Sequence, residues 1–331
     1  MKIFPRLLCL LLVYALSATA LAQANATTKK VSLLFVGDMV LDDLPGKAME
    51  QGIDPYASVA ALFQSADIRI GNLECVIASG GKAVEKNFTF RAHPRSLNYL
   101  KKYFDAISIA NNHSGDYGPN AFAEMLNFFE QHKIGHFGGG HNLSQAHRPF
   151  LIEKNGIKIA LLGYDEFMPR SFEANLNTPG VAWSEDDYVI RDIKAAREID
   201  HADIVIPFMH WGWENEMKAG RRQRELARIM IDAGADAVVG AHPHVIQDTE
   251  QYRGKPIIYS LGNFMMDAVD NEAQTKGWAL RLHVSKTGVE SWDTQVTKID
   301  PKTGIPALLP EEKSPCWDKK SGQTASCENR L

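Results

Sequence analysis

Side chains that can bind divalent metal ions follow six apolar stretches of this sequence. They are Asp38 after residues 31–36, Asn72 and Glu74 after 68–70, Asn111, Asn112 and His113 after 106–110, His210 after 204–208, His242 and His244 after 237–239, and Asn263 after 257–261. If these stretches are neighbouring parallel strands of a sheet, their carboxyl ends meet at one edge, where α/β proteins bind ligands. The pattern therefore predicts that these side chains converge on one small volume.

The chemistry of these side chains favours a hard or borderline metal ion. Carboxylates, amide oxygens and imidazoles suit Zn, Mn, Fe or Mg, whereas Cu(I) and iron–sulfur clusters prefer sulfur ligands. Single motifs are weak, because Asp38 after a glycine is common in turns and a lone His210 is more often a packed core residue. His242 and His244 are more specific, because Pro243 between them restricts the backbone and aims both imidazoles at a shared centre. The combined pattern predicts a site for one or two divalent ions.

Alternating β-rich and helical stretches surround these motifs, as in an α/β domain. The helical stretches are residues 57–63, 95–103, 122–131, 187–199 and 221–233. Asn155-Gly156 separates two apolar runs and predicts a β-hairpin, because both residues accept positive φ. Residues 280–284 and 294–298 alternate between apolar and polar side chains, which is typical of half-exposed antiparallel strands. We therefore expect mixed sheets in a single domain.

The composition is that of an ordinary globular protein. Of the 331 residues, 45% are hydrophobic and 23% are charged, which provides enough apolar material for one large core. The formal net charge is −4. A mildly acidic chain without a basic stripe argues against a nucleic-acid partner.

The first 22 residues have the layout of a secretory signal peptide. Lys2 and Arg6 precede the apolar run 7–16, and small residues follow it up to Ala22. This run is shorter than the roughly 20 residues that a membrane-spanning helix needs. We therefore expect cleavage near Ala22, no other transmembrane span, and a mature domain over residues 23–300 that is secreted or periplasmic.

Three cysteines remain after removal of this segment. Cys316 and Cys327 lie close together in the polar tail 301–331, and in an oxidising compartment we expect them to form a disulfide that staples the tail. Cys75 lies in an apolar segment, and we expect it to be a buried thiol rather than a nucleophile.

The ordered set of motifs resembles the CapA family of capsule and poly-γ-glutamate synthesis proteins. The motifs are Gly37-Asp38, Gly71-Asn72-Leu73-Glu74, Asn111-Asn112-His113 with Asp116 and Gly118, His210-Trp211-Gly212 with Glu214, and residues 240–245. The resemblance covers about residues 31–264. That family is similar in fold to the calcineurin-like metallophosphatases. The resemblance therefore implies a four-layer αββα sandwich with mixed sheets and a dinuclear metal edge.

The resemblance also implies a role for each ligand. It assigns Asp38 and His244 to one metal ion, Asn112, His210 and His242 to the other, and Glu74 to a position that bridges them. His113 is implied as the proton donor or oxyanion stabiliser. One expected ligand is missing, because the metallophosphatase pattern has a histidine where this chain has Val40. Unless Asp42 or Asp43 provides this ligand instead, the half-site of Asp38 and His244 binds its metal ion more weakly. We then expect the protein to hold closer to one ion than two.

Four further residues are candidates for contact with a substrate. Arg91 could grip a carboxylate or phosphate through its guanidinium, and Trp211 could form an apolar wall. Glu214 and Asn263 lie next to the metal-binding motifs in the sequence. We expect either Trp211 or Trp213 to be a core residue instead of a wall.

Two functions are compatible with these features. The first is an exported metal-dependent hydrolase of phosphoester or amide bonds, which acts on an anionic polymer or a cell-envelope precursor alongside other capsule synthesis proteins. The second is a non-catalytic accessory or binding subunit of a polymer synthesis or export complex. The missing ligand at Val40 favours the second function, whereas His113 favours the first, because a structural metal site needs no proton donor.

Overall fold

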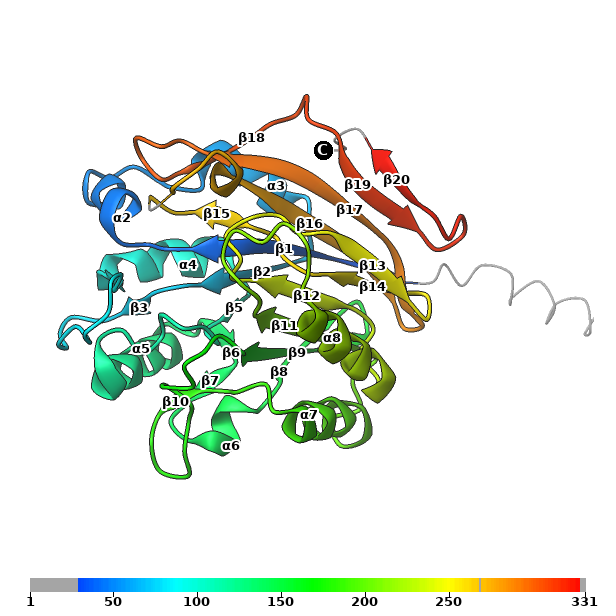
Figure 1. Cartoon of the computed structure of the whole chain (residues 1–331), viewed down its shortest axis with the longest axis horizontal. Coiled ribbons are helices and arrows are strands. Elements are labelled where there is room, and N and C mark those ends of the chain that lie inside the picture. Colours follow the sequence, from blue (N-terminus) through cyan, green and yellow to red (C-terminus); the bar gives the residue numbers. More distant parts are fainter. Residues whose placement is uncertain (1–28, 268, 328–331) are drawn as a thin grey trace, which may run out of the picture.

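The computed structural model describes residues 29–267 and 269–327, so the expected signal segment 1–22 lies outside the described residues. Two large β-sheets run through the molecule (Figure 1). The ten-stranded sheet has the order β20-β19-β17-β16-β1-β2-β5-β6, with β15 beside β1 and β18 beside β17. The six-stranded sheet has the order β13-β14-β12-β11-β9-β8.

The strands of the ten-stranded sheet are β1 Val31–Met39, β2 Ile68–Leu73, β5 Ala106–Ser108, β6 Gly135–Phe137, β15 Asn263–Met265, β16 Lys276–Ser285, β17 Gly288–Ile299, β18 Pro306–Leu308, β19 Ser314–Asp318 and β20 Thr324–Cys327. Those of the six-stranded sheet are β8 Phe150–Lys154, β9 Ile157–Asp165, β11 Ile204–His210, β12 Val238–Ala241, β13 Thr249–Tyr252 and β14 Lys255–Ile258. Two small pairs join β3 Val76–Ile77 to β4 Arg91–Ala92 and β7 Gly139–Gly140 to β10 Gly180–Val181.

The helices are α2 Asp43–Glu50, α3 Ala60–Gln64, α4 Leu97–Tyr103, α5 Gly118–His132, α6 Leu143–Ala146, α7 Asp186–Glu198 and α8 Arg221–Ala233, and short 3₁₀ turns cover Ala57–Val59, Pro94–Ser96 and Ala273–Thr275. The five helical stretches predicted from the sequence are confirmed, two of them as a 3₁₀ turn that runs into a short α-helix. Pro119 lies in the first turn of α5, where no backbone hydrogen bond is lost.

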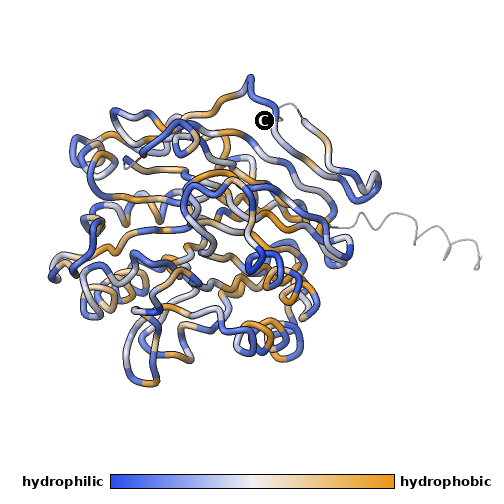
Figure 2. Tube along the Cα trace, in the orientation of Figure 1, coloured by the Kyte–Doolittle hydropathy of each residue, from blue (hydrophilic) through white to orange (hydrophobic). Residues whose placement is uncertain are grey.

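Four layers follow from the alternation of side chains along the central strands. On β1, Leu33 and Phe35 pack between the two sheets, whereas Leu34 and Val36 pack against α3, α4 and α5. On β11, Ile206 packs between the sheets, and the side chains of opposite orientation pack against α7 and α8. Figure 2 shows these apolar strands inside and hydrophilic turns outside. The αββα sandwich with mixed sheets is therefore confirmed.

The predicted antiparallel pairs are also confirmed. Strands β8 and β9 form a hairpin in which Asn155 (φ 54°) and Gly156 (φ 74°) make the turn. Strands β16 and β17 pair over their whole length and bring the antiparallel half of the ten-stranded sheet next to β1. Each pairing rests on a local signal, so the sequence was sufficient to predict it.

One expectation about the sheet was wrong. The strands that precede the polar motifs are not neighbours in one sheet, because β1, β2 and β5 belong to the ten-stranded sheet and β11, β12 and β14 to the six-stranded one. The chain crosses between the sheets after β14, and β15 then pairs with β1. In addition, β1 and β2 are longer than predicted, so Asp38 and Asn72 lie within strands instead of after them.

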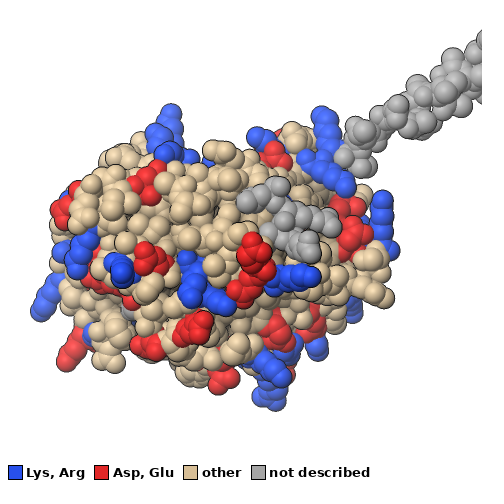
Figure 3. Space-filling model, turned by 90° about the horizontal axis from the view of Figure 1, so that it is seen from above, with Lys and Arg blue, Asp and Glu red and all other residues tan. Residues whose placement is uncertain are grey.

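The segment after residue 300 extends the ten-stranded sheet. Strand β19 pairs with β17, β20 pairs with β19, and Trp317 is buried in the layer between the sheets. Cys316 and Cys327 are joined as a disulfide with Cα atoms 5.8 Å apart, and Cys75 is buried. In Figure 3, one face of the molecule carries Lys and Arg interspersed with Asp and Glu. Within the described residues, no helix combines the length and apolar character that a membrane span requires.

Candidate metal centre

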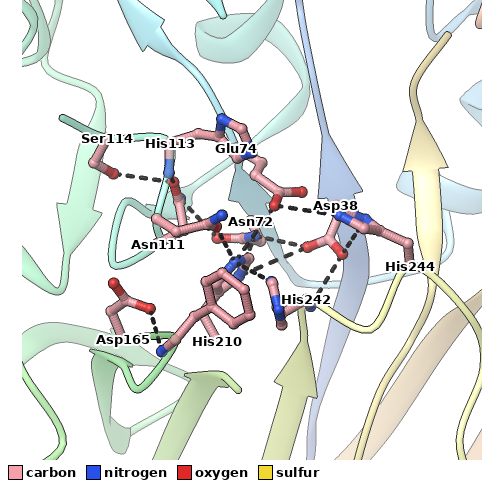
Figure 4. Close-up of polar contacts among 12 residues, drawn as sticks. Asp38, Asn72, Glu74, Asn111, His113, Ser114, Asp165, His210, His242 and His244 are labelled. Atoms are coloured by element: carbon pink, nitrogen blue, oxygen red, sulfur yellow. Dashed lines mark hydrogen bonds and ion pairs between the residues drawn. The ribbon is translucent and has the colours of Figure 1, made fainter. Parts of the chain in front are cut away.

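The six side chains that the sequence singles out as ligands meet between the two sheets (Figure 4). The ten-stranded sheet provides Asp38 at the end of β1, Glu74 just after β2 and Asn112 in the turn after β5. The six-stranded sheet provides His210 at the end of β11, and His242 and His244 just after β12. The cluster therefore takes its carboxylates from one sheet and its imidazoles from the other.

The first ligand group consists of Asp38, Glu74 and His244, whose ligand atoms all lie within 4.8 Å of one another. His244 Nδ1 is 3.5 Å from Asp38 Oδ2, and His244 Nε2 is 3.8 Å from Glu74 Oε1. His244 Nδ1 is also 2.9 Å from Asn263 Oδ1, a contact that leaves Nε2 directed toward Glu74.

The second ligand group consists of Glu74, His210 and His242, again with ligand atoms within 4.8 Å. His210 Nε2 lies 3.4 Å from Glu74 Oε1, 3.0 Å from His242 Nδ1 and 2.8 Å from Asn112 Oδ1. Glu74 is the member common to both groups. The two groups therefore form adjacent half-sites that share one carboxylate.

An unusual backbone presents the two histidines that follow β12. His242 (φ 96°) and His244 (φ 58°) both lie at positive φ, which is uncommon for residues other than glycine and is often found at functional sites. Pro243 between them fixes its own φ. The His242 amide donates a hydrogen bond to Asp38 Oδ2 at 3.1 Å, which ties this turn to the opposite sheet.

Unsatisfied buried atoms show that these residues suit a cation. Among the described residues, neither carboxylate oxygen of Glu74 nor Nε2 of His242 has a hydrogen-bond partner, although all three atoms are buried. Buried polar groups are almost always satisfied, so such atoms need an explanation. A divalent ion bound to Glu74 and His242 would satisfy all of them, and the donor set of carboxylate and imidazole suits Zn, Mn, Fe or Mg.

Burial and mutual charge set the protonation of the cluster. Burial lowers the pKa of His210 to about 3 and that of His242 well below its usual range, so both imidazoles are in the neutral form that binds metals. Burial and the neighbouring Asp38 raise the pKa of Glu74 well above its usual range. Burial alone would lower the pKa of His244, but Glu74 and Asp38 raise it to about 10.

Two asparagines support Asp38 from the side of the ten-stranded sheet. Asn72 donates to Asp38 Oδ1 at 2.7 Å, and Asn111 donates to the Leu73 carbonyl at 2.8 Å and to Asn72 Oδ1 at 3.3 Å. These contacts orient the carboxylate through a chain of amides. The sequence motif contained Asn72, but nothing in its type or spacing showed that it would act on Asp38.

His113 lies beside the cluster without belonging to either ligand group. Its Nδ1 is 2.7 Å from Asp116 Oδ2, and Phe90 packs against the ring at 4.7 Å between centroids. Lys86 holds the other oxygen of Asp116 at 2.7 Å and the Asn112 carbonyl at 2.9 Å. Burial lowers the pKa of His113, although Asp116 raises it in part. A neutral imidazole anchored through Nδ1 has Nε2 left for proton transfer.

Among the described residues, the missing ligand at position 40 is not replaced, because neither Asp42 nor Asp43 belongs to a ligand group. Val40 is fully buried in the apolar core. Asp42 instead accepts a hydrogen bond from the Arg91 amide at 2.8 Å. The half-site of Asp38 and His244 therefore keeps three ligand side chains with Glu74, whereas the other half-site has four with Asn112.

Arg91, which the sequence suggests as a substrate contact, is not brought to this cluster. Its guanidinium donates to the Gly80 carbonyl at 3.2 Å and lies 4.5 Å from the centre of the Tyr117 ring. Arg91 lines a separate cavity of about 380 Å³ together with Asp42 and Lys47. The side chain anchors the loop that contains Gly80 and, in the part of the chain that the structure describes, does not contact the metal cluster.

Trp211 and Asn263, two further candidates for substrate contact, are buried and have polar partners within the protein. Trp211 is fully buried and donates from its indole nitrogen to the Tyr259 carbonyl at 2.8 Å, whereas Trp213 is 68% exposed. Asn263 is buried between His244 and the Gln274 carbonyl and orients the imidazole. Glu214 is exposed, as a substrate contact requires, and its charge contributes to the raised pKa of Glu74.

Asp165 at the end of β9 is a buried acid that the sequence analysis missed. It accepts a hydrogen bond from the Phe167 amide at 3.0 Å, and Figure 4 shows it at the edge of the cluster. Burial raises its pKa to about 7. The signal was present, because Asp165 follows an apolar run just as Asp38 does. It was overlooked because that run was interpreted only as half of a hairpin.

The fold and the cluster together define a two-sheet α/β sandwich with buried residues between the strand ends that could hold a metal ion. Residues 32–268 match the family described as bacterial capsule synthesis protein PGA_cap. The chain belongs to this family, as its resemblance to CapA proteins predicted.

Two relatives and one solved structure illustrate the similarity. The PGA biosynthesis protein CapA of Bacillus subtilis (strain 168) is 35% identical over 316 residues, which cover 91% of this chain and 82% of that protein. The capsule biosynthesis protein CapA of Bacillus anthracis is 28% identical over 311 residues, which cover 90% and 74%. A hypothetical protein from Thermus thermophilus shares the fold, with a TM-score of 0.53, 16% identity and coverage of 81% and 99%.

Proposed function

We propose that this protein is an exported metal-dependent hydrolase that acts on a phosphoester or amide bond of a capsule or cell-envelope precursor. The observation that carries this proposal is Glu74, a buried carboxylate without hydrogen bonds that is common to two ligand groups. His113 stands beside these groups with its own acidic partner. A structural metal site has no use for such a residue, whereas hydrolysis needs a proton donor for the leaving group.

The proposed metal ligands and His113 have different roles in hydrolysis. Divalent ions held by Asp38, Glu74, Asn112, His210, His242 and His244 would polarise a phosphoryl or carbonyl oxygen and lower the pKa of water. Asp116 accepts a hydrogen bond from His113 Nδ1–H, which leaves Nε2 as the free nitrogen. Nε2 can then accept a proton from the attacking water and pass it to the departing oxygen or nitrogen. Lys86 neutralises Asp116 and keeps this pair in place. The buried position of the cluster excludes bulk water and strengthens these interactions.

The relatives support the proposed substrate class and partners. Their names connect them to the biosynthesis of capsule and PGA. A γ-glutamyl amide and a phosphoester both present the oxygen that such a centre polarises. Other capsule synthesis proteins are the proposed partners. Export through the N-terminal segment would place the enzyme where capsule is assembled, and mass spectrometry of extracellular protein should find a start near Gln23 instead of Met1.

The accessory role remains the second candidate, and Val40 favours it. With a core valine at this position, the half-site of Asp38 and His244 has only three ligand side chains. A site that holds one ion tightly can stabilise a binding subunit without turnover. The two functions differ in their need for His113, so a single variant separates them.

The test compares the purified chain with His113→Ala. We expect both proteins to bind Mn²⁺ or Zn²⁺ equally, as measured by mass spectrometry of the metal content, because His113 is outside the ligand groups. Turnover of an activated phosphoester or a γ-glutamyl amide should fall at least about 100-fold, which is the usual contribution of a general acid. Equal turnover in the two proteins, or no turnover in either, would favour the accessory role. His136→Ala, at a partly buried histidine of β6, is the matched control.

A further inference from the structure

Exposed apolar side chains lie in segments that contact the metal centre. Nine large apolar side chains are exposed within the described residues, and five of them lie in segments 84–90, 166–172 and 211–217: Val84 (43%), Phe88 (58%), Met168 (60%), Trp213 (68%) and Met217 (63%). All three segments touch the centre. Lys86 of the first contacts Asn112, Phe167 of the second packs on His242 at 4.0 Å between ring centres, and the third follows His210 directly.

Two cavities meet along these segments. One of about 680 Å³ is lined by Val84, Phe167 and Phe172 together with Asn112 of the metal centre. The other, of about 270 Å³, is lined by Phe167, Met168 and Trp213. Phe167 belongs to both, and its ring lies 6.1 Å from that of Trp213. A continuous apolar surface therefore leads from Val84 past the metal centre to Trp213; we call Val84, Phe167, Met168 and Trp213 the apolar rim.

The charges around these cavities do not suit a polyanion. Every cation that lines them is paired with a carboxylate: Lys86 with Asp116 at 2.7 Å, Arg222 with Asp186 at 2.6 Å and Arg221 with Glu225 at 3.7 Å. Glu85 and Glu166 line the same cavities, and the exposed Glu214 adds further negative charge. A bare polymer of carboxylates would meet these acids without an unpaired cation to bind.

We propose that the substrate of this centre is an amphiphile, with a phosphoryl head that the metal ligands receive and a hydrocarbon chain that lies along the apolar rim. This inference rests on the proposed function, because it requires the centre to bind a phosphoryl group. The class of ligand is a lipid-linked phosphate precursor instead of the free anionic polymer. Large exposed apolar patches usually mark a binding surface, and here the patch is continuous with the metal centre.

The test uses non-hydrolysable phosphonates that differ only in chain length. Methyl-, hexyl- and decylphosphonate are titrated calorimetrically into the full chain loaded with Mn²⁺, below the concentration at which they aggregate. Each methylene that is fully buried improves affinity about fourfold. With partial burial along an open rim, we expect hexylphosphonate to bind at least about tenfold more tightly than methylphosphonate.

Variants of the rim locate the effect. Val84→Ser, Met168→Ser and Trp213→Ser should each reduce the gain with chain length and leave the affinity for methylphosphonate unchanged. Ile199→Ser, at a residue that is 75% exposed outside the three segments, is the matched control and should retain the full gain. None of these side chains is a metal ligand, and all are exposed, so folding is not at risk.

The outcomes separate this inference from the function on which it rests. If the three phosphonates bind with equal affinity, the apolar rim does not bind the hydrocarbon chain. The same conclusion follows if a γ-glutamate oligomer binds more tightly than decylphosphonate and displaces it. Either result would overturn this inference and leave the proposed metal centre unaffected. If no phosphonate binds at all, this inference fails, whereas turnover of a γ-glutamyl amide that depends on His113 would still support the proposed function. Loss of the chain-length effect in Ile199→Ser as well as in the rim variants would also overturn the assignment.

Discussion

Replacement of Glu74 by glutamine should weaken metal binding and stabilise the metal-free protein at the same time. Glu74 is the carboxylate common to both ligand groups, and its two oxygens are buried without hydrogen bonds. In the absence of a cation, an ionised carboxylate in this position is unfavourable, which is why burial and Asp38 raise its pKa. Glutamine has nearly the same shape and removes the charge from both half-sites.

The sign of the effect on stability depends on pH. Because the folded protein binds the Glu74 proton more tightly than the unfolded chain, the folded state loses stability as the pH rises above the unfolded value of 4.5. The loss amounts to about 1.4 kcal/mol for each pH unit until the folded pKa is reached. Glu74→Gln removes this loss. The variant should therefore match the parent near pH 4 and exceed it progressively at higher pH.

The magnitude of the effect on metal binding follows from the position of Glu74. Residues that merely orient a ligand change metal affinity about 10–100-fold when they are replaced. A ligand common to both half-sites should exceed this, so we expect the affinity for Mn²⁺ to fall by more than about 100-fold. Calorimetric titration at pH 7.5 measures this, and urea unfolding of the metal-free proteins from pH 4 to 8 measures stability.

The control and the contrary results are equally specific. Glu130→Gln, at a side chain that is 65% exposed, should change neither quantity. If Glu74→Gln bound Mn²⁺ like the parent, Glu74 would not be a ligand. If the variant lost stability at pH 8 in the absence of metal, Glu74 would be a satisfied structural residue, and the account of its unpartnered oxygens would be wrong.

Three further expectations follow from the same geometry. His242→Ala should remove most bound metal, whereas Asp38→Asn should reduce it less because its half-site has fewer ligands; equal losses in mass-spectrometric metal content would contradict this asymmetry. Asn263→Ala should weaken Mn²⁺ binding about 10–100-fold in calorimetry, since it frees the ring that Asn263 orients, and an unchanged affinity would refute that role. Thiol counting on denatured, unreduced protein should find one thiol, because Cys316 and Cys327 are joined; three thiols would disprove the bridge.

Local signals in the sequence were sufficient for individual elements but not for their arrangement. Helix α8 begins and ends as its amphipathic pattern predicts, and Asn155-Gly156 determines the hairpin of β8 and β9. The assignment of strands to sheets was wrong, because an apolar run buried on both faces has the same composition in either sheet. The crossing from β14 to β15 could not be predicted for the same reason, so the contact between Asn263 and His244 was not predicted either.

The ligands were easier to predict than their support. Asp38, His210 and His242 are side chains with metal-binding chemistry at strand ends, so their types and positions in the sequence both point to a site. Asn72 and Asn263 act through contacts with residues that are distant in the sequence, and an amide side chain has many other uses. Trp211 and Trp213 show the same limit, because one is buried and the other is exposed although they belong to the same motif.

The position of the cluster between the sheets links metal binding to the stability of the sandwich. Each ligand group combines a carboxylate from the ten-stranded sheet with an imidazole from the six-stranded one, so a bound ion joins the two layers. Without an ion, the hydrogen bond from the His242 amide to Asp38 still joins the two sheets at this edge. A ligand that binds only the folded state stabilises it by about 2.7 kcal/mol at a concentration 100 times its Kd. The metal ion is therefore expected to act on the fold and on the chemistry through the same contacts, because Glu74 can be satisfied only when both sheets are in place.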